Sequence, residues 1–207
     1  FLEDAEHLKE TNPDAYKNEY LGEANGNGGN VFEYLEIREI TAEEISHFDR
    51  IYQGCDWGFY PDPFAFVRFY YNHNNDTLYF IDEIYKNKLT NRKSADIILE
   101  RGYTDFEITC DSAEPKSIND FRDFGIPARG AIKGPGSVEY SMKWLQGRKI
   151  VIDPKRTPGV HKEFTKYEYE RDKDGNIISG YPDKDNHLID ATRYGSEKLW
   201  RRRGSSA

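Results

Sequence analysis

Two segments of the sequence end in the same pair of residues, Cys55-Asp56 and Cys110-Asp111, and each pair closes a run of residues typical of a β-strand. Side chains alternate across a strand, so in each pair the cysteine and the aspartate are expected on opposite faces of a sheet. If the two strands are neighbours, both carboxylates emerge at one edge of the sheet and both thiols point into the core. Taken alone, either aspartate could instead be a turn former or a helix cap.

A third carboxylate, Asp190, lies inside a segment with helical spacing, residues 186–194. His187 precedes it by three positions and therefore shares its helix face. An acid between two apolar residues in mid-helix is poorly placed for solvent or for capping. The alternative to a functional role is a structural salt bridge, for instance with Arg193 or Lys184. His187 could orient or protonate groups beside the acids, because its pKa range suits proton transfer, or it could simply pack on the helix.

Together the three carboxylates indicate metal-dependent chemistry. Carboxylates within a few ångströms repel by roughly 4 kcal/mol per close pair at an effective dielectric constant of 20. Such a cluster is tolerated when one acid stays protonated or when a divalent cation lies among them, and hard oxygen ligands favour Mg²⁺ or Mn²⁺. Two such ions about 3.5–4 Å apart can activate water and stabilise the leaving oxygen of a phosphodiester. We therefore expect Asp56, Asp111 and Asp190 to be metal ligands and catalytic acids, with His187 beside them.

The charge distribution is compatible with a nucleic-acid partner in spite of a net charge of −8. Residues 1–48 hold 12 acidic and 3 basic side chains, whereas residues 49–207 hold 25 acidic and 26 basic ones. Nine of these basic residues lie within residues 128–166, opposed by three acids, and such an excess can hold a phosphate backbone. A solvated mixed surface is the alternative for any one of them. The candidate DNA-binding residues are Lys133, Arg129, Lys155 and Arg156.

Lys133 opens a glycine-rich loop, residues 133–137, that superficially suggests a phosphate-binding motif. It differs from a Walker A motif, in which the lysine follows the second glycine and directly precedes Ser or Thr. We expect a tight loop before a helix, where Lys133 and free backbone N–H groups could meet a DNA phosphate, with a simple turn as the alternative.

The elements that must position these residues combine strands with helices, and their order predicts a mixed α/β sheet. Hydrophobic periodicity predicts strands over 51–56, 64–71, 78–85, 106–111, 129–133 and 149–152, and it also allows one over 31–40. Helices are predicted to begin at Thr41 and to cover 94–101, 115–124, 138–146, 160–167 and 185–200. A hairpin is predicted over 169–178, with its turn at Asp174-Gly175. We place the main domain boundary near Asp49.

Composition excludes several other classes of protein. The two cysteines lack the spacing of a zinc site, since no CxxC pair or Cys/His pattern accompanies them. No stretch approaches the 18 or so apolar residues of a membrane span, and the first residues do not resemble a signal peptide. A soluble intracellular protein with no membrane partner is expected.

Four ordered motifs resemble the C-terminal nuclease domain of the large terminase subunit of tailed bacteriophages, and most of all that of phages from Gram-positive bacteria. A further segment, Tyr20-Leu21-Gly22-Glu23, resembles the connection between the ATPase and the nuclease of that family. The four motifs are Gly54-Cys55-Asp56-Trp57-Gly58, Thr109-Cys110-Asp111-Ser112-Ala113-Glu114-Pro115, Lys133-Gly134-Pro135-Gly136-Ser137 and Asn186-His187-Leu188-Ile189-Asp190-Ala191-Thr192-Arg193-Tyr194.

The resemblance implies an RNase H-like fold, with a mixed central sheet, flanking helices and a β-hairpin insertion. It implies a site with two Mg²⁺ or Mn²⁺ ions, and endonucleolytic cleavage of double-stranded concatemeric viral DNA during genome packaging. Asp56, Asp111 and Asp190 match the family's catalytic acids, with His187 beside them, and Asp185 could be an accessory acid.

Family members begin with an ATPase that carries Walker motifs, and this sequence has none. We therefore expect residues 1–48 to be a linker after an absent ATPase domain and residues 49–207 to be the nuclease domain. Expected partners are double-stranded DNA and that ATPase domain, and they could include the small terminase subunit and the portal protein. The expected location is the cytoplasm of the infected bacterial host. Two alternatives stay open: another RNase H-like nuclease, such as a resolvase or RNase H, and a non-catalytic DNA-docking module whose acids are structural.

Overall fold

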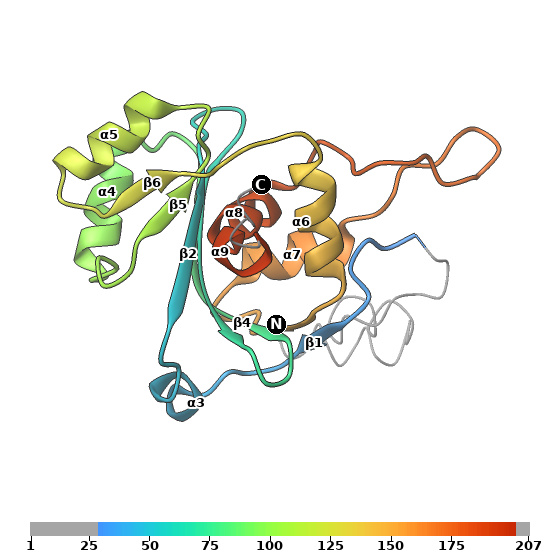
Figure 1. Ribbon diagram of the computed structural model, residues 1–207, viewed down its shortest axis with the longest axis horizontal. Coiled ribbons are helices and arrows are strands. Elements are labelled where there is room, and N and C mark those ends of the chain that lie inside the picture. Colours follow the sequence, from blue (N-terminus) through green and yellow to red (C-terminus); the bar gives the residue numbers. More distant parts are fainter. Residues whose placement is uncertain (1–28, 202–207) are drawn as a thin grey trace, which may run out of the picture.

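A mixed seven-stranded sheet forms the centre of the part of the chain that the computed structural model describes, residues 29–201 (Figure 1). The order of its strands is β1-β7-β4-β3-β2-β5-β6. Strand β3 runs antiparallel to β2 and β4, and the other six strands of this sheet share one direction. The strands are β1 (Leu35–Ile37), β2 (Ile51–Asp56), β3 (Phe64–Asn72), β4 (Thr77–Lys86), β5 (Ile108–Cys110), β6 (Ala128–Gly130) and β7 (Lys149–Ile152).

Helices cover both faces of the sheet (Figure 1). Helices α4 and α5 lie on one face, and α6, α7, α8 and α9 lie on the other. This is the mixed α/β sheet with flanking helices that the sequence predicts. The helices are α3 (Ala42–Ser46), α4 (Asn91–Glu100), α5 (Pro115–Asp123), α6 (Ser137–Gln146), α7 (Pro158–Lys166), α8 (His187–Gly195) and α9 (Glu197–Trp200).

Strand β3 shows how the two faces are packed, because its alternate residues enter two separate apolar clusters. Val67 and Phe69 pack in the cluster formed with α6, α7 and α8. Phe64 and Phe66 pack in the cluster formed with α4 and α5. Every residue of the neighbouring strand β2 is buried, so the strand that ends in Asp56 is covered on both faces.

The predicted strands and helices are present, but several of them begin or end at other residues than the sequence predicts. Strand β5 covers 108–110 instead of 106–111, and β6 ends at Gly130, which leaves Lys133 in a loop. The helix predicted over 185–200 begins at His187, because Asp185 has a positive φ of 51°. It is interrupted at Ser196, which separates α8 from α9. Within residues 29–201, no helix is both long and apolar enough to cross a membrane.

Residues 31–48 pack with the sheet although they were assigned to a linker. Strand β1 pairs in parallel with β7, and Val31 and Phe32 are buried in the cluster of α6, α7 and α8. Thr41 and Glu44 form a capping box at the start of α3, where a helix start was expected. The sheet therefore extends N-terminal to the boundary expected near Asp49, because these apolar residues complete its core. The Tyr20–Glu23 segment lies outside the described residues.

The predicted hairpin over 169–178 is present as a loop with a short pairing. Arg171 and Ile177 form a single antiparallel bridge, and Ile178 N–H donates to the Glu170 carbonyl oxygen over 2.7 Å. Gly175 has a positive φ of 85°, as a turn at Asp174-Gly175 requires. In Figure 1 the loop projects away from the sheet.

Candidate active site

The two Cys-Asp pairs lie side by side at the ends of adjacent parallel strands. Cys55 of β2 stands opposite Cys110 of β5, and the Asp111 N–H donates to the Cys55 carbonyl oxygen over 2.9 Å. Both cysteines are fully buried in the cluster against α4 and α5, and burial raises the pKa of the Cys55 thiol well above its usual range. Asp56 and Asp111 therefore emerge together at one edge of the sheet, in the arrangement expected from the repeated Cys-Asp pattern.

Helix α8 brings Asp190 to the same place because it packs on β2 at backbone contact. A Cβ on Gly54 would lie 1.8 Å from the Ala191 carbonyl oxygen, and a Cβ on Gly195 would lie 2.9 Å from the Gly54 nitrogen. Only glycine at both positions allows so close an approach. Asp190 directly precedes Ala191, so this contact holds its side chain near Asp56.

His187, the first residue of α8, contacts Asp56. Its Nδ1 lies 3.2 Å from Asp56 Oδ2, and its Nε2 lies 3.5 Å from Oδ1 of the exposed Asp62. The hydrogen bond with Asp56 is the main cause that raises the pKa of His187, and burial opposes it. The imidazole is thus held between a buried and an exposed carboxylate, beside the acids.

The three aspartates share one electrostatic environment. Burial is the main cause that raises the pKa of Asp56, and the negative charges of Asp190 and Asp111 raise it further. Burial also raises the pKa of Asp190. Burial and the charges of all three carboxylates raise the pKa of Tyr194, which lies one helical turn beyond Asp190. A partly buried site that gathers several carboxylates favours either protonation or a bound cation.

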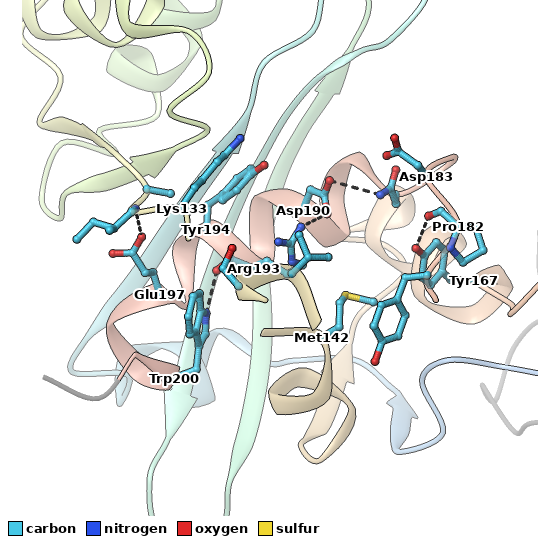
Figure 2. A pocket seen from close by; sticks show the side chains of 16 residues that line it. Lys133, Met142, Tyr167, Pro182, Asp183, Asp190, Arg193, Tyr194, Glu197 and Trp200 are labelled. Atoms are coloured by element: carbon cyan, nitrogen blue, oxygen red, sulfur yellow. Dashed lines mark hydrogen bonds and ion pairs between the residues drawn. The ribbon is translucent and has the colours of Figure 1, made fainter. Parts of the chain in front are cut away.

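Two of the three carboxylates form a salt bridge with a basic side chain of the protein. The Lys133 ammonium contacts Asp111, and Arg193 Nη1 donates to Asp190 Oδ1 over 2.6 Å. Figure 2 shows Arg193 reaching along α8 to Asp190, with Lys133 beside the Tyr194 ring, 5.6 Å from its centroid. The salt bridge that is the structural alternative for Asp190 is therefore present, and the charge of Asp190 also raises the pKa of Asp56.

The donor set suits a hard divalent cation, although the carboxylates are not preassembled around one. Within residues 29–201, no group of three or more His, Cys, Asp or Glu side chains is placed to hold a metal ion. Carboxylate oxygens are the ligands that Mg²⁺ and Mn²⁺ prefer, and the charges that meet here are those that a cation would neutralise. Asp56, Asp111 and Asp190 fit as ligands if the ion takes over the neutralising role of Lys133 and Arg193.

A pocket of about 300 Å³ opens beside Asp190 (Figure 2). Asp183 lines the same pocket, and its charge contributes to the raised pKa of Asp190. Asp185, the accessory acid expected from the sequence, lines a different pocket of about 370 Å³ together with Glu163. Of these two acids, Asp183 is the one that shares a pocket with Asp190. The sequence offered no signal that distinguishes them.

Two of the four candidate DNA-binding residues lie close to the site or to the loop that leads to it. Lys133 is at the site, in contact with Asp111. Arg129, at the end of the sheet, forms ion pairs of 2.9 Å with both Glu107 and Glu197. Its guanidinium group is therefore already paired with carboxylates of the protein.

Lys155 and Arg156 lie away from the carboxylates. They follow β7, which is three strands from β2 in the sheet. Neighbouring strands lie about 4.8 Å apart, so β7 is displaced from β2 by roughly 14 Å across the sheet. Arg156 Nε donates to the Ile40 carbonyl oxygen over 3.0 Å, so the structure does not bring these two residues to the site.

The residues that hold α8 in place were not predicted from the sequence. Glu163 of α7 is buried and accepts hydrogen bonds from the backbone of Leu188 and Ile189. Ser141 of α6 accepts a hydrogen bond of 2.8 Å from Arg193 Nε. The signal for Glu163 was available, because it is an acid on the apolar face of a helix, as Asp190 is. Its partner could not be identified, because it lies 25 positions along the chain.

The sheet, its strand-end carboxylates and the helix that adds a third define an α/β protein of the RNase H-like class. The family described as "Terminase RNAseH like domain" matches residues 56–198. The chain is 44% identical over 211 residues to the terminase large subunit of Bacillus phage SPP1, a match that covers 100% of this chain and 50% of that protein. It is 33% identical over 199 residues to the PBSX phage terminase large subunit of Bacillus subtilis (strain 168), covering 94% and 46%.

Among solved structures, the nuclease domain of the SPP1 large terminase, crystallised with bound Mn, matches with a TM-score of 0.77 at 44% identity, covering 81% of this chain and 98% of that one. The chain belongs to the terminase RNase H-like domain family. The family resemblance carried by the four motifs is confirmed, and so is the RNase H-like fold. The chain spans about half the length of the curated relatives it matches.

Proposed function

We propose that this chain is the endonuclease domain of a phage large terminase, which cuts double-stranded concatemeric DNA during genome packaging with a pair of Mg²⁺ or Mn²⁺ ions. The proposal is supported by the way β2, the end of β5 and α8 bring Asp56, Asp111 and Asp190 to one edge of the sheet, where the charges of the other two acids raise the pKa of Asp56. The similarity to the SPP1 nuclease domain, whose crystal structure holds Mn, supports it.

Each residue of the site has a distinct part in this proposal. Asp56, Asp111 and Asp190 would hold the ions through their carboxylate oxygens. When bound, such ions activate a water molecule and stabilise the leaving oxygen of a phosphodiester. His187 orients Asp56 through its Nδ1 contact, and its Nε2 faces the exposed Asp62, from where it can exchange a proton with the leaving group or with solvent.

Lys133 is the best-supported contact for DNA. Its side chain is 47% exposed, and it opens the loop that leads into α6. If a metal ion replaces it at Asp111, its ammonium becomes available for a backbone phosphate. Arg129, Lys155 and Arg156 would act elsewhere, because the first is held in ion pairs and the other two lie three strands away. Lys155 and Arg156 would hold DNA at a distance from the cut, and Arg129 would do so only after leaving its ion pairs with Glu107 and Glu197.

The remaining expectations concern the full-length protein. We propose that residues N-terminal to the sheet connect this domain to an ATPase domain, as the length of the relatives supports. The small terminase subunit and the portal protein are further proposed partners. Packaging would take place in the cytoplasm of the infected bacterium.

Cleavage of plasmid DNA in Mn²⁺, in Mg²⁺ or in EDTA tests the proposal. Cleavage is expected with either metal and not in EDTA, and Asp56→Asn, Asp111→Asn and Asp190→Asn should each lower the rate by about 10³-fold, since loss of an ion removes several kcal/mol of transition-state stabilisation. Asp96→Asn is the matched control, because Asp96 only pairs with Arg92 on the surface of α4. Undiminished cleavage by all three variants would exclude the metal site.

A non-catalytic DNA-docking module is the second candidate, and one observation favours it. Asp111 and Asp190 are paired with Lys133 and Arg193, and the described acids do not form a preassembled metal group. On this alternative, the protein binds duplex DNA equally in Mn²⁺ and in EDTA and never cuts it. Assays on branched junctions and on RNA–DNA hybrids separate the resolvase and RNase H alternatives from cleavage of duplex DNA.

A further inference from the structure

A buried glutamate caps the helix that carries half of the candidate site. Helix α8 begins at His187, and its N-cap residue, Asn186, makes no side-chain capping hydrogen bond. Glu163 of α7 supplies the cap from outside the helix. Its Oε2 accepts the N–H of Leu188 over 2.8 Å and the N–H of Ile189 over 3.1 Å. These are the second and third N–H groups of α8, which have no partner within a helix.

This cap is remote in sequence and buried. Glu163 is 5% exposed, and burial raises its pKa to about 7. The Tyr85 hydroxyl lies beside the same carboxyl group. A local cap such as serine or aspartate would satisfy the same N–H groups at lower cost. What Glu163 adds is a fixed position of α8 relative to α7 and the sheet.

The position of the first turn of α8 matters because two functional side chains leave from it. His187 is the first residue of the helix, and its ring contacts Asp56 at 3.2 Å. Asp190 is the fourth residue of the helix, and its negative charge raises the pKa of Asp56. A displacement of this turn moves both side chains together, and misplacement by about 1 Å is enough to impair a catalytic site.

We propose that Glu163 is a positioning residue for the metal site, which holds the first turn of α8 so that His187 and Asp190 meet the Asp56 carboxylate. The inference rests on the proposed function, since it takes these side chains to be part of a metal site. Glu163 touches none of the reacting groups and acts through the backbone of α8.

The chain contains a matched control for this role. Glu83 of β4 caps helix α7 in the same way, because its Oε1 accepts the N–H of Gly159 over 2.7 Å and its Oε2 that of Val160 over 2.8 Å. Burial raises the pKa of Glu83 as well. Helix α7 carries none of the proposed metal ligands, but it carries Glu163 at its sixth position. Removal of the Glu83 cap should therefore loosen the first turn of α7 and can reach the site only through the Glu163 cap.

The experiment measures two quantities on the full chain: amide hydrogen exchange and the Kd for Mn²⁺ by electron paramagnetic resonance. In Glu163→Leu, exchange at Leu188 and Ile189 should rise about tenfold more than at the later amides of α8, and the Kd should weaken about tenfold, as for loss of other residues that orient metal ligands. Glu163→Gln keeps an oxygen at the cap and should restore both quantities to within about threefold of the wild type. Glu83→Leu should raise exchange at Gly159 and Val160, and it should weaken the Kd only as far as it also raises exchange at Leu188 and Ile189.

The inference is overturned if Glu163→Leu binds Mn²⁺ like the wild type, or if either Glu163→Leu or Glu83→Leu weakens binding without raising exchange at Leu188 and Ile189. If Glu163→Leu does not fold, Glu163→Asp takes its place, because it keeps the charge and shortens the reach. An unchanged Kd in that variant also overturns the inference. A wild-type chain that binds no Mn²⁺ would instead refute the proposed function, and this inference with it.

Discussion

The two faces of the central sheet bury different kinds of side chain. On the face of α6 to α9, charged groups are buried among apolar ones, including Glu163, Arg193 and Glu197. On the other face, the side chains that α4 and α5 bury are apolar or carry small hydroxyl groups, and the buried Gln53 of β2 accepts a hydrogen bond from Arg68. The buried residues of α4 and α5 are Ser94, Ala95, Ile98, Ser117, Ile118 and Phe121.

The difference indicates that the two faces contribute different things to the protein. Apolar burial stabilises the fold by roughly 25 cal/mol per Å² and requires no particular geometry of charges. A buried charge costs stability unless it is paired and hydrogen-bonded, so its presence calls for another explanation. Here the buried charges surround Asp190 and the helix that carries it. Substitutions on the face of α4 and α5 should therefore affect stability alone. Substitutions on the face of α8 should affect the proposed metal site as well.

The largest change in stability is expected on the apolar face. Ile98→Ala removes a fully buried side chain of α4 and should lower the free energy of unfolding by about 4 kcal/mol, through lost burial and the cavity left behind. The Kd for Mn²⁺ should not change. Urea denaturation measures the first quantity, and Leu99→Ala, at a position 37% exposed on the same helix, is the control. A weakened Kd in Ile98→Ala would break the division between the faces.

The pH dependence of stability should report the buried charge on the other face. Burial raises the pKa of Glu163 from 4.5 to about 7 in the folded state. The folded protein then holds this proton more tightly than the unfolded chain, so ionisation of Glu163 lowers stability as the pH rises from about 4.5 to 7, by up to roughly 3 kcal/mol. Glu163→Gln cannot ionise, so its stability relative to the wild type should rise over that window. Parallel stability curves for the two proteins between pH 5 and pH 8 would contradict this.

The contact between β2 and α8 should be sensitive to a single methyl group. Gly54→Ala places a Cβ against the Ala191 carbonyl oxygen and forces the helix to shift, which should cost about 2 kcal/mol and weaken Mn²⁺ binding as well. Gly147→Ala is the control, because a Cβ there would meet its neighbours at an ordinary 3.7 Å. Thermal unfolding and Mn²⁺ titration measure the two effects. Loss of stability without loss of affinity would show that α8 can move without disturbing the site.

The smallest expected effect is on the salt dependence of DNA binding, which should differ between basic residues at the site and those remote from it. Lys133→Ala should reduce the slope of log K against log [salt] for duplex DNA by about 1, as expected for one phosphate contact. Lys155→Ala should change the slope less, since Lys155 follows a strand three positions away from β2. Fluorescence anisotropy over a range of salt concentrations measures both. An equal change in the two variants would indicate that DNA covers both regions.

The features predicted correctly from the sequence are those that depend on local spacing. The repeated Cys-Asp pairs indicated two adjacent strand ends, and the spacing of His187 and Asp190 indicated one helix face. Features that depend on distant contacts were not accessible. The segment 31–40 could not be assigned to the sheet, because its partner β7 lies more than a hundred positions away.

The charge composition of the sequence also failed to predict where the basic residues lie relative to the candidate site. It grouped Arg129 and Arg156 with Lys133 because all three lie in one basic segment. Arg129 proved to be held by Glu197, 68 positions away, and Arg156 proved to lie at the opposite part of the sheet. The residues next to Arg129 and Arg156 in the sequence do not indicate either of these locations.

The register that places Cys55 of β2 opposite Cys110 of β5 also fixes which face of the sheet each aspartate occupies. A slip of one residue between β2 and β5 would turn one of the two strands over, so that its aspartate entered the apolar cluster and its cysteine faced α8. A misaligned pairing of β2 with β5 would therefore place a carboxylate among apolar side chains, which costs free energy. The aspartates proposed to bind metal thus also favour the register in which Cys55 stands opposite Cys110.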